Sequence, residues 1–436
     1  MAQSSDKQKA VLALSIASQT CTTALSALAS PRSLSSNYFT DTPSSTSTPP
    51  PLETLHADLL SILQMTSHSI TKLALVLKPS GPPVYSVSVP VLTDLTSQIS
   101  DLAGCAETFG LYRATYGEYL VKEVTQLVED VVYNARSLLQ AYLHLASDST
   151  GRRIMSAPRV PGLMNAEDFL IGSSKEEYLK LTGTIHELVD GATGASPTLL
   201  SESTKSAGKN KATSPGLSKN NVEAVKKLWM IDGGSVRDGV RELKEMIEDS
   251  NDDGADKDEG FGADEDEDNG WAELGIGNSK LKKDEVECAK QVLPLLNLTT
   301  TLHIHLPTLF TRPTPSSSSS PLAPSLPNST LSLLPPLSSS LLSTSDDLIA
   351  TLYSPQNSAS ISQCIRALVR VVKELEGVFT PIHGLEGKMA ELKINEGEQE
   401  GGGGEENKER KKREVLMGMF GRIYKVAETL LERLGT

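Results

Sequence analysis

The sequence predicts an all-α protein in which two antiparallel helical bundles are joined by an acidic, disordered linker. Apolar residues recur at intervals of three and four through most of the chain, and alternating apolar and polar residues occur only briefly, near residues 84–91. The division is predicted by the run Glu248–Asp268, which holds twelve carboxylates and one lysine in a chain of net charge −14. Because such a run cannot bury apolar surface, we expect it to be disordered.

The first half contains a series of segments with helical periodicity. The clearest apolar stripe begins at Leu120 and continues through Val131 to Leu145, which is one face of a long helix. The segment at 84–91 lies between prolines and is interpreted as a connection, because proline is disfavoured inside strands. The predicted helices are 6–28, 52–77, 91–109, 117–147, 174–191 and 219–249.

The second half shows the same periodicity, most clearly from Ile361 to Phe379 and from Leu416 to Leu430. Pro294 falls inside the first of its apolar segments and is expected to kink or split that helix. The predicted helices are 280–311, a short one near 343–353, 358–394 and 411–434.

These elements predict three regions: an N-terminal bundle at 1–249, an acidic linker at 250–270 and a C-terminal bundle at 271–436. Each bundle is long enough to bury its own core. Biased segments interrupt both bundles, and we expect them to be mobile insertions at the bundle ends. They are the Ser/Pro-rich 31–51 and 312–340, the Ser/Lys-rich 193–218 and the Glu/Gly-rich 395–407.

Composition excludes several classes of function. The sequence pI of about 5.1 argues against direct nucleic-acid binding, because there is no broad excess of Lys and Arg for phosphates. No run of about 18 apolar residues indicates a membrane span. The cysteines are widely spaced, as in reduced proteins of the cytoplasm or nucleus, and form neither a disulfide scaffold nor a Cys-rich zinc site. They are Cys21, Cys105, Cys288 and Cys364.

Two patterns suggest metal binding, and neither is complete. Asp249–Gly260 resembles the first half of an EF-hand calcium loop, but its twelfth position is Gly260 where a bidentate Glu is required. His303 and His305 would point about 200° apart on a helix, so we interpret them as surface or half-buried helix residues. We expect neither a metal nor a cofactor.

No motif indicates catalysis. The glycines at Gly401 lack the Lys and Ser/Thr of a phosphate-binding loop, and no nucleophile lies in a recognised catalytic context, so we predict that the protein is not an enzyme. A basic cluster precedes the last predicted helix. It is either a nuclear-import signal or a solvated, Lys-rich helix start. Its members are Lys408, Arg410, Lys411, Lys412 and Arg413.

Several stretches, read in order, resemble the family of cyclin-D-interacting proteins (GCIP). The first is Ser218–Val225, which leads into a helix ending at 236–243. The acidic run, Trp271 and a proline-containing helix around Pro294 follow. The last is Asp346-Asp347-Leu348, followed by Leu352-Tyr353-Ser354-Pro355, where Ser354 replaces a proline of the family pattern.

The resemblance implies a non-enzymatic regulator in cytoplasm and nucleus that binds cyclins and helix-loop-helix transcription regulators and restrains the cell cycle. It also implies bundles like those of talin and vinculin. A cytoskeletal bundle that binds actin or a partner helix is the alternative function. Trp271 is the candidate partner contact, because tryptophan is enriched at interface hot spots. The alternative is that it anchors the linker to the second bundle.

Overall fold

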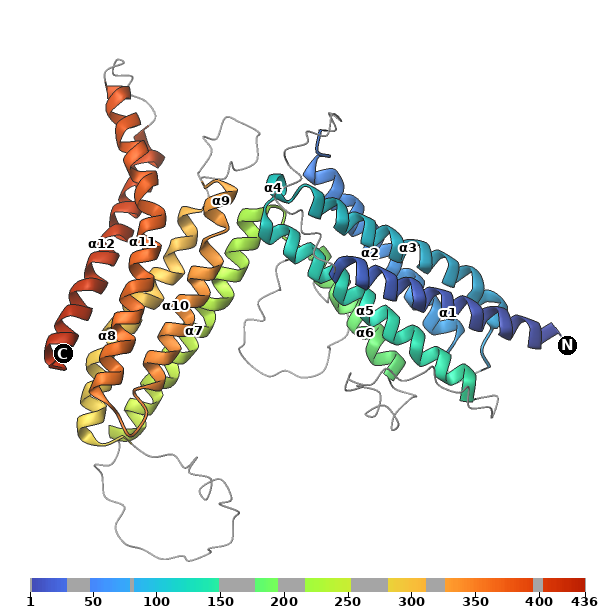
Figure 1. Ribbon diagram of the computed structural model, residues 1–436, viewed down its shortest axis with the longest axis horizontal. Coiled ribbons are helices and arrows are strands. Elements are labelled where there is room, and N and C mark those ends of the chain that lie inside the picture. The colour runs from blue at the N-terminus through green and yellow to red at the C-terminus, as the bar shows by residue number, and fades with distance from the viewer. Residues whose placement is uncertain are drawn as a thin grey trace, which may run out of the picture. The chain divides into compact units, whose positions relative to one another are not determined.

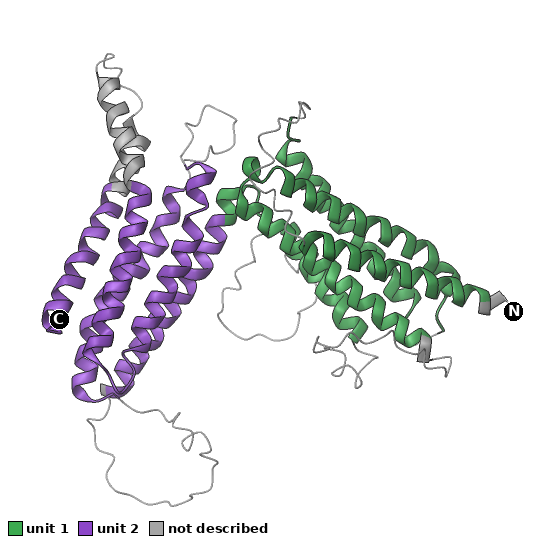
Figure 2. Cartoon of the chain, in the orientation of Figure 1, with its two compact units in different colours: residues 1–224 green, residues 225–436 purple. Residues whose placement is uncertain are grey.

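The computed structural model describes residues 2–29, 48–78, 82–148, 177–194, 216–251, 281–310, 326–394 and 403–435. Every regular element in these ranges is a helix, so the all-α prediction is confirmed (Figure 1). Within them the chain forms two compact units, residues 1–224 and 225–436 (Figure 2).

Unit 1 is a bundle of long helices around an aliphatic core. Helix α1 packs against α3 and α5, α2 packs against α3 and α6, and α5 packs against α6 (Figure 1). The core is mostly Leu, Ile, Val and Ala, and Phe109 is among its largest fully buried side chains. The helices are α1 (Ala2–Ala29), α2 (Leu52–Val76), α3 (Tyr85–Leu111), the short α4 (Arg113–Tyr116), α5 (Glu118–Asp148) and α6 (Glu177–Thr193).

Helix α1 is the one helix among the described residues whose length and composition would allow it to cross a membrane, over Ser5–Ala29. A core helix of a soluble bundle passes the same test. In unit 1, α1 places Leu14, Ala17 and Cys21 in the core against its neighbours. The absence of a membrane span therefore stays a prediction.

Unit 2 is built from the helices that follow. Helix α10 packs on α11, α11 on α12, and α12 on α8. Helix α7 joins them through side-chain contacts to α8 and α10 that are described below. The elements are α7 (Asn221–Asn251), α8 (Lys283–His305), the 3-10 helix η2 (Leu306–Leu309), α9 (Asn328–Leu331), α10 (Leu334–Ala350), α11 (Ser358–Ile394) and α12 (Gly403–Arg433).

The division between the units differs from the predicted one. The sequence places the helix near 219–249 in the N-terminal bundle, whereas most of α7 belongs to unit 2, because the boundary falls within its first turn, after Ala224. The acidic run therefore connects two helices of the same unit, α7 and α8. A run of charged residues shows that a segment is solvated, but it does not show whether the helices on either side of that segment belong to one unit or to two. Residues 252–280 lie outside the described residues, so the disorder of the linker remains a prediction.

Two predicted element bounds are wrong, and both involve proline. The presumed connection at 84–91 forms the start of α3, where Pro90 removes only one backbone hydrogen bond near the helix end. Helix α8 continues through Pro294, so the split is wrong, whereas the alternative, a kink, stays a prediction. The insertion predicted at 312–340 is helical from Asn328 onward, and Pro335 lies in the first turn of α10, where a missing N–H costs little.

The last loop is also shorter than predicted. The Glu/Gly-rich segment 395–407 ends in helix, because α12 begins at Gly403. The other predicted helices are present with bounds within a few residues of those expected.

Candidate partner-binding surface

The start of α7 is fixed by side chains that cap two helices at once. Asn220 Oδ1 accepts a hydrogen bond from the Glu223 backbone N–H at 3.0 Å, and Glu223 Oε2 accepts one from the Lys219 N–H at 2.9 Å. These bonds satisfy backbone donors that a helix start leaves without intrahelical partners. The stretch Ser218–Val225, which resembles the GCIP family, thus begins with a capping motif.

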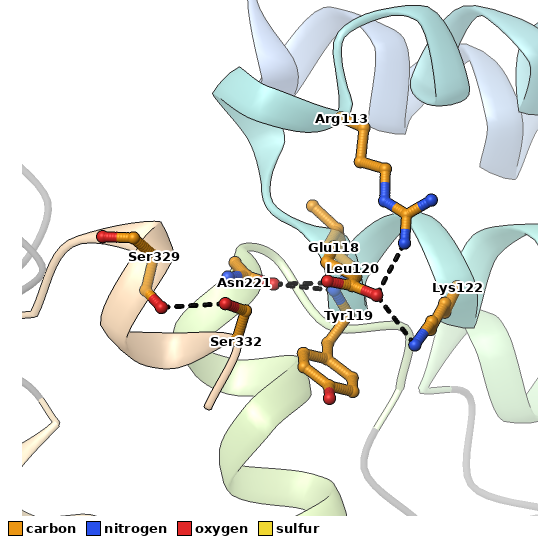
Figure 3. A network of polar contacts seen from close by, with 8 residues as sticks. All are labelled: Arg113, Glu118, Tyr119, Leu120, Lys122, Asn221, Ser329 and Ser332. Carbon is orange, nitrogen blue, oxygen red and sulfur yellow. Dashed lines mark hydrogen bonds and ion pairs between the residues drawn. The ribbon is translucent and has the colours of Figure 1, made fainter. Parts of the chain in front are cut away.

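Asn221 caps a different helix, about a hundred residues earlier in the chain. Its Oδ1 accepts hydrogen bonds from the backbone N–H groups of Tyr119 at 3.0 Å and Leu120 at 3.2 Å, at the start of α5 (Figure 3). The residue before α5, Gly117, has φ +95° and no side chain, and a Cβ there would overlap Asn221. Asn221 thus supplies the cap that position 117 cannot.

A small ion-pair network lies beside this cap. Glu118 contacts Arg113 at 2.6 Å and Lys122 at 2.9 Å (Figure 3). The hydrogen bond from Lys122 is the main cause that lowers the pKa of the Glu118 carboxyl. Because all three groups are partly exposed, the network contributes about 1 kcal/mol or less.

Eight residues after Asn221, Trp229 joins α7 to α8 through a reciprocal pair of hydrogen bonds. Its indole Nε1 donates to the His303 carbonyl oxygen at 2.7 Å, and His303 Nε2 lies 3.1 Å from the Trp229 carbonyl oxygen. Ser338 Oγ of α10 lies 3.0 Å from the same nitrogen. Since a carbonyl oxygen only accepts, Nε2 carries the proton. We call Trp229, His303 and Ser338 the buried polar seam.

The seam lies in the core of unit 2. All three residues are fully buried, and Trp229 packs edge-on against Phe310, which stacks on Phe379 of α11. His303 Nδ1 has no hydrogen-bond partner among the described residues. Burial lowers the pKa of His303 to about 4, so the ring stays neutral near pH 7.

Helix α7 approaches α8 and α10 closely because two of its inward positions are glycine. A Cβ at Gly233 would meet the His303 ring at 3.0 Å, and one at Gly239 would meet Ile349 of α10 at 3.1 Å. Next to Gly233, Asp232 accepts a hydrogen bond from Ser339 of α10 at 3.2 Å. The middle of α7 is therefore packed closely against α8 and α10 within unit 2.

Three apolar side chains of α7 are exposed, although most other exposed residues of this helix are charged or polar. Leu228, Met230 and Ile231, which we call the α7 cluster, are 39%, 69% and 59% exposed, although they flank the buried Trp229. Ile304, next to His303, and Leu333, next to the first residue of α10, are also exposed. Single exposed apolar residues are ordinary on protein surfaces, whereas contiguous apolar patches mark interaction sites. The adjacent Met230 and Ile231 are therefore the strongest candidates for a partner contact on α7.

The described residues contain no candidate metal cluster, and their buried thiols are poorly reactive. No group of three or more His, Cys, Asp or Glu among the described residues could hold a metal ion. Cys21 and Cys105 are buried, and burial raises the pKa values of their thiols to about 12 and about 11, which disfavours the reactive thiolate.

Two sequence interpretations change. His303, expected at the surface or half-buried, is fully buried, whereas His305 is exposed at the end of α8. The apolar spacing of α8 places residue 303 on the same face as Leu296 and Thr299. The burial of His303 was therefore indicated by the sequence. Trp229, which the sequence analysis missed, continues the stripe of Val222 and Val225 at helical spacing.

The remaining predicted sites are not tested. Trp271 and most of the acidic run lie outside the described residues. The basic cluster from Lys408 to Arg413 falls on α12 by its backbone, and its side chains are not described. Their roles stay predictions.

Comparison with known proteins agrees with the family resemblance. A family model described as "Grap2 and cyclin-D-interacting, C-terminal" matches residues 262–377, which include α8, η2, α9, α10 and the first part of α11. None of the curated proteins searched matches the chain. The match covers about a quarter of the chain, and Ser218–Val225 lies outside it. Over this region the chain is similar to the GCIP family.

Proposed function

We propose that this protein is a non-enzymatic regulator of cell-cycle progression that acts in cytoplasm and nucleus by binding protein partners, with a D-type cyclin or a helix-loop-helix transcription regulator as the partner class. The observation that carries the proposal is the match of residues 262–377 to a domain family whose description refers to Grap2 and cyclin D. Helical bundles bind partners through apolar helix faces, often by accepting an amphipathic helix.

The α7 cluster is the surface we propose for this contact. Met230 and Ile231 expose aliphatic surface on a helix whose inner face is held by the buried polar seam, so a partner would meet a rigid platform. A preorganised surface loses little conformational entropy on binding, which favours affinity. Because the seam lies between α7 and the matched helix α8, partner binding and the family region would be physically connected.

The test is binding of the purified full-length chain to a purified D-type cyclin, measured by calorimetry. The double variant Met230→Asp/Ile231→Asp should weaken binding at least tenfold, because truncating or charging an interface hot spot costs about 2 kcal/mol or more. The control is Leu75→Asp on α2, since Leu75 is 67% exposed and Met230 is 69% exposed. Both proteins should keep the wild-type melting temperature.

Equal binding by the double variant and the Leu75→Asp control would exclude the α7 cluster as the contact. No binding of the wild-type chain to either partner class would contradict the proposed function itself. Sedimentation with filamentous actin would then favour the cytoskeletal alternative.

The nuclear part of the proposal rests on the basic cluster. Replacing Lys408, Arg410, Lys411, Lys412 and Arg413 with Ala should shift a fluorescent fusion of the chain from the nucleus to the cytoplasm. An unchanged distribution would show that the cluster is not an import signal.

A further inference from the structure

The loop between α10 and α11 contains a serine that is followed by proline and held by a carboxylate. Ser354 Oγ donates a hydrogen bond to Glu285 Oε1 of α8 at 3.2 Å. The neighbouring residues Tyr353 and Pro355 are exposed, and Ser354 itself is half-buried. The serine thus lies at the surface of unit 2 although its hydroxyl is engaged.

Glu285 is the centre of a polar clamp that joins this loop to the start of α8. Its carboxylate accepts backbone hydrogen bonds from Lys282 at 2.9 Å and Gln356 at 3.2 Å, in addition to the one from Ser354. The Gln356 side-chain amide donates to the Glu285 carbonyl oxygen at 2.9 Å and to the Leu352 carbonyl oxygen at 2.7 Å. The hydrogen bond from the Lys282 backbone is the main cause that lowers the pKa of Glu285, so the carboxylate is ionised near pH 7.

We propose that Ser354 is a phosphorylation site for a proline-directed serine/threonine kinase, and that its phosphorylation opens the Glu285 clamp. Kinases of this class require a Ser-Pro or Thr-Pro pair, and Ser354-Pro355 supplies one. In the reaction, Ser354 Oγ attacks the γ-phosphorus of ATP and forms the new O–P bond. The bond from that phosphorus to the β,γ-bridging oxygen breaks, ADP leaves, and the hydroxyl proton passes to the kinase's catalytic base.

Phosphorylation changes both the hydrogen bonding and the charge of this contact. The phosphoserine Oγ no longer carries a proton, so the hydrogen bond to Glu285 is lost. The phosphate brings a charge of about −1.5 to −2 next to an ionised carboxylate, and like charges at this distance repel. Because the same carboxylate caps α8 and holds the Gln356 backbone, its displacement releases the α10–α11 loop and uncaps α8.

The test uses the full-length chain treated with a purified mitogen-activated protein kinase and ATP. Mass spectrometry should locate phosphate on Ser354, and the treated wild-type protein should melt about 2–4 °C below the treated Ser354→Ala variant, after each is corrected for its untreated form. This comparison cancels the effect of other Ser-Pro and Thr-Pro pairs in the chain, because both proteins retain them.

Two charge variants test the mechanism without a kinase. Ser354→Glu should lower the melting temperature of the wild-type protein. The same substitution should lower the melting temperature of the Glu285→Gln variant by less than half as much, because the second charge of the repelling pair is then absent. Failure to find phosphate on Ser354 while other pairs are modified would overturn the site. An unchanged melting temperature on phosphorylation, or an equal effect of Ser354→Glu in both backgrounds, would overturn the switch.

Discussion

Different kinds of contact stabilise the interiors of the two units. The core of unit 1 is mostly aliphatic, and the hydrogen bonds of His186 with Ser67 and Thr71 between α6 and α2 lie near its surface. A buried interhelical polar contact of this unit is the cap that Asn221 provides at the start of α5. Unit 2 buries a polar seam in which Trp229 and His303 exchange hydrogen bonds. Aliphatic packing is non-directional, whereas hydrogen bonds fix one register. The buried hydrogen bonds of unit 2 therefore fix how α7 packs against α8 and α10. The stability of unit 1 depends more on how completely apolar side chains fill its core.

The largest expected effect comes from removing α7 altogether. A fragment 216–436 contains the whole seam, whereas a fragment 271–436, which starts at the predicted bundle boundary, leaves His303 and Phe310 without Trp229. We expect the longer fragment to unfold cooperatively and the shorter one to be poorly folded. Thermal unfolding of the two fragments, monitored by circular dichroism, tests this expectation. A cooperative 271–436 fragment would favour the predicted boundary over the observed one.

Matched core truncations compare the two units directly. Trp229→Ala and Phe109→Ala each remove a fully buried aromatic ring, and each should cost about 3–5 kcal/mol. Because the two residues belong to different units, calorimetry of the full chain should show one lowered transition for each variant, and a different one in each case. If both variants lower a single shared transition, the chain folds as one cooperative body.

Acid should weaken unit 2 through His303. Its pKa is about 4 in the folded protein and about 6.5 when unfolded, so the unfolded state binds the proton more readily. The stabilisation is therefore fully present above pH 6.5 and is lost as the pH falls toward 4. It amounts to about 3 kcal/mol at most.

His303→Gln is the control for this pH dependence, since Gln stays neutral and can still donate to the Trp229 carbonyl oxygen. Melting temperatures measured between pH 7 and pH 4 should fall more steeply for the wild-type protein than for this variant. Parallel curves would show that His303 is not the responsible group.

The smallest effect concerns the cap in unit 1. Gly117→Ala should destabilise the protein by about 1–3 kcal/mol, because a side chain at φ +95° is strained and overlaps Asn221. Asn221→Ala should cost about 1 kcal/mol through the lost cap of α5. The double variant should be less destabilised than the sum, since shortening Asn221 relieves the overlap. Chemical denaturation measures all three, and strict additivity would contradict the steric account.

The candidate surface was only partly predictable from the sequence. The helical spacing that places Trp229 and His303 on the inner faces of α7 and α8 is present in the sequence, although His303 was expected at the surface or half-buried. The exposure of Met230 and Ile231 was not predictable, because periodicity shows which positions share a face but not how many faces neighbouring helices cover. The roles of Ser354 and Glu285 depend on a contact between residues about seventy positions apart.

The sequence by itself determined the all-α class and most helix bounds, because helical periodicity and capping residues are local properties of the chain. It also carried the similarity of residues 262–377 to the GCIP family model. Only the tertiary structure decided that most of α7 belongs to the second unit. It also showed that Asn221 caps a helix a hundred residues away, and that the acidic run connects two helices of one unit. The physical reason is that packing partners are selected by complementary surfaces such as Gly233 against His303. A composition boundary along the chain carries no information about that complementarity.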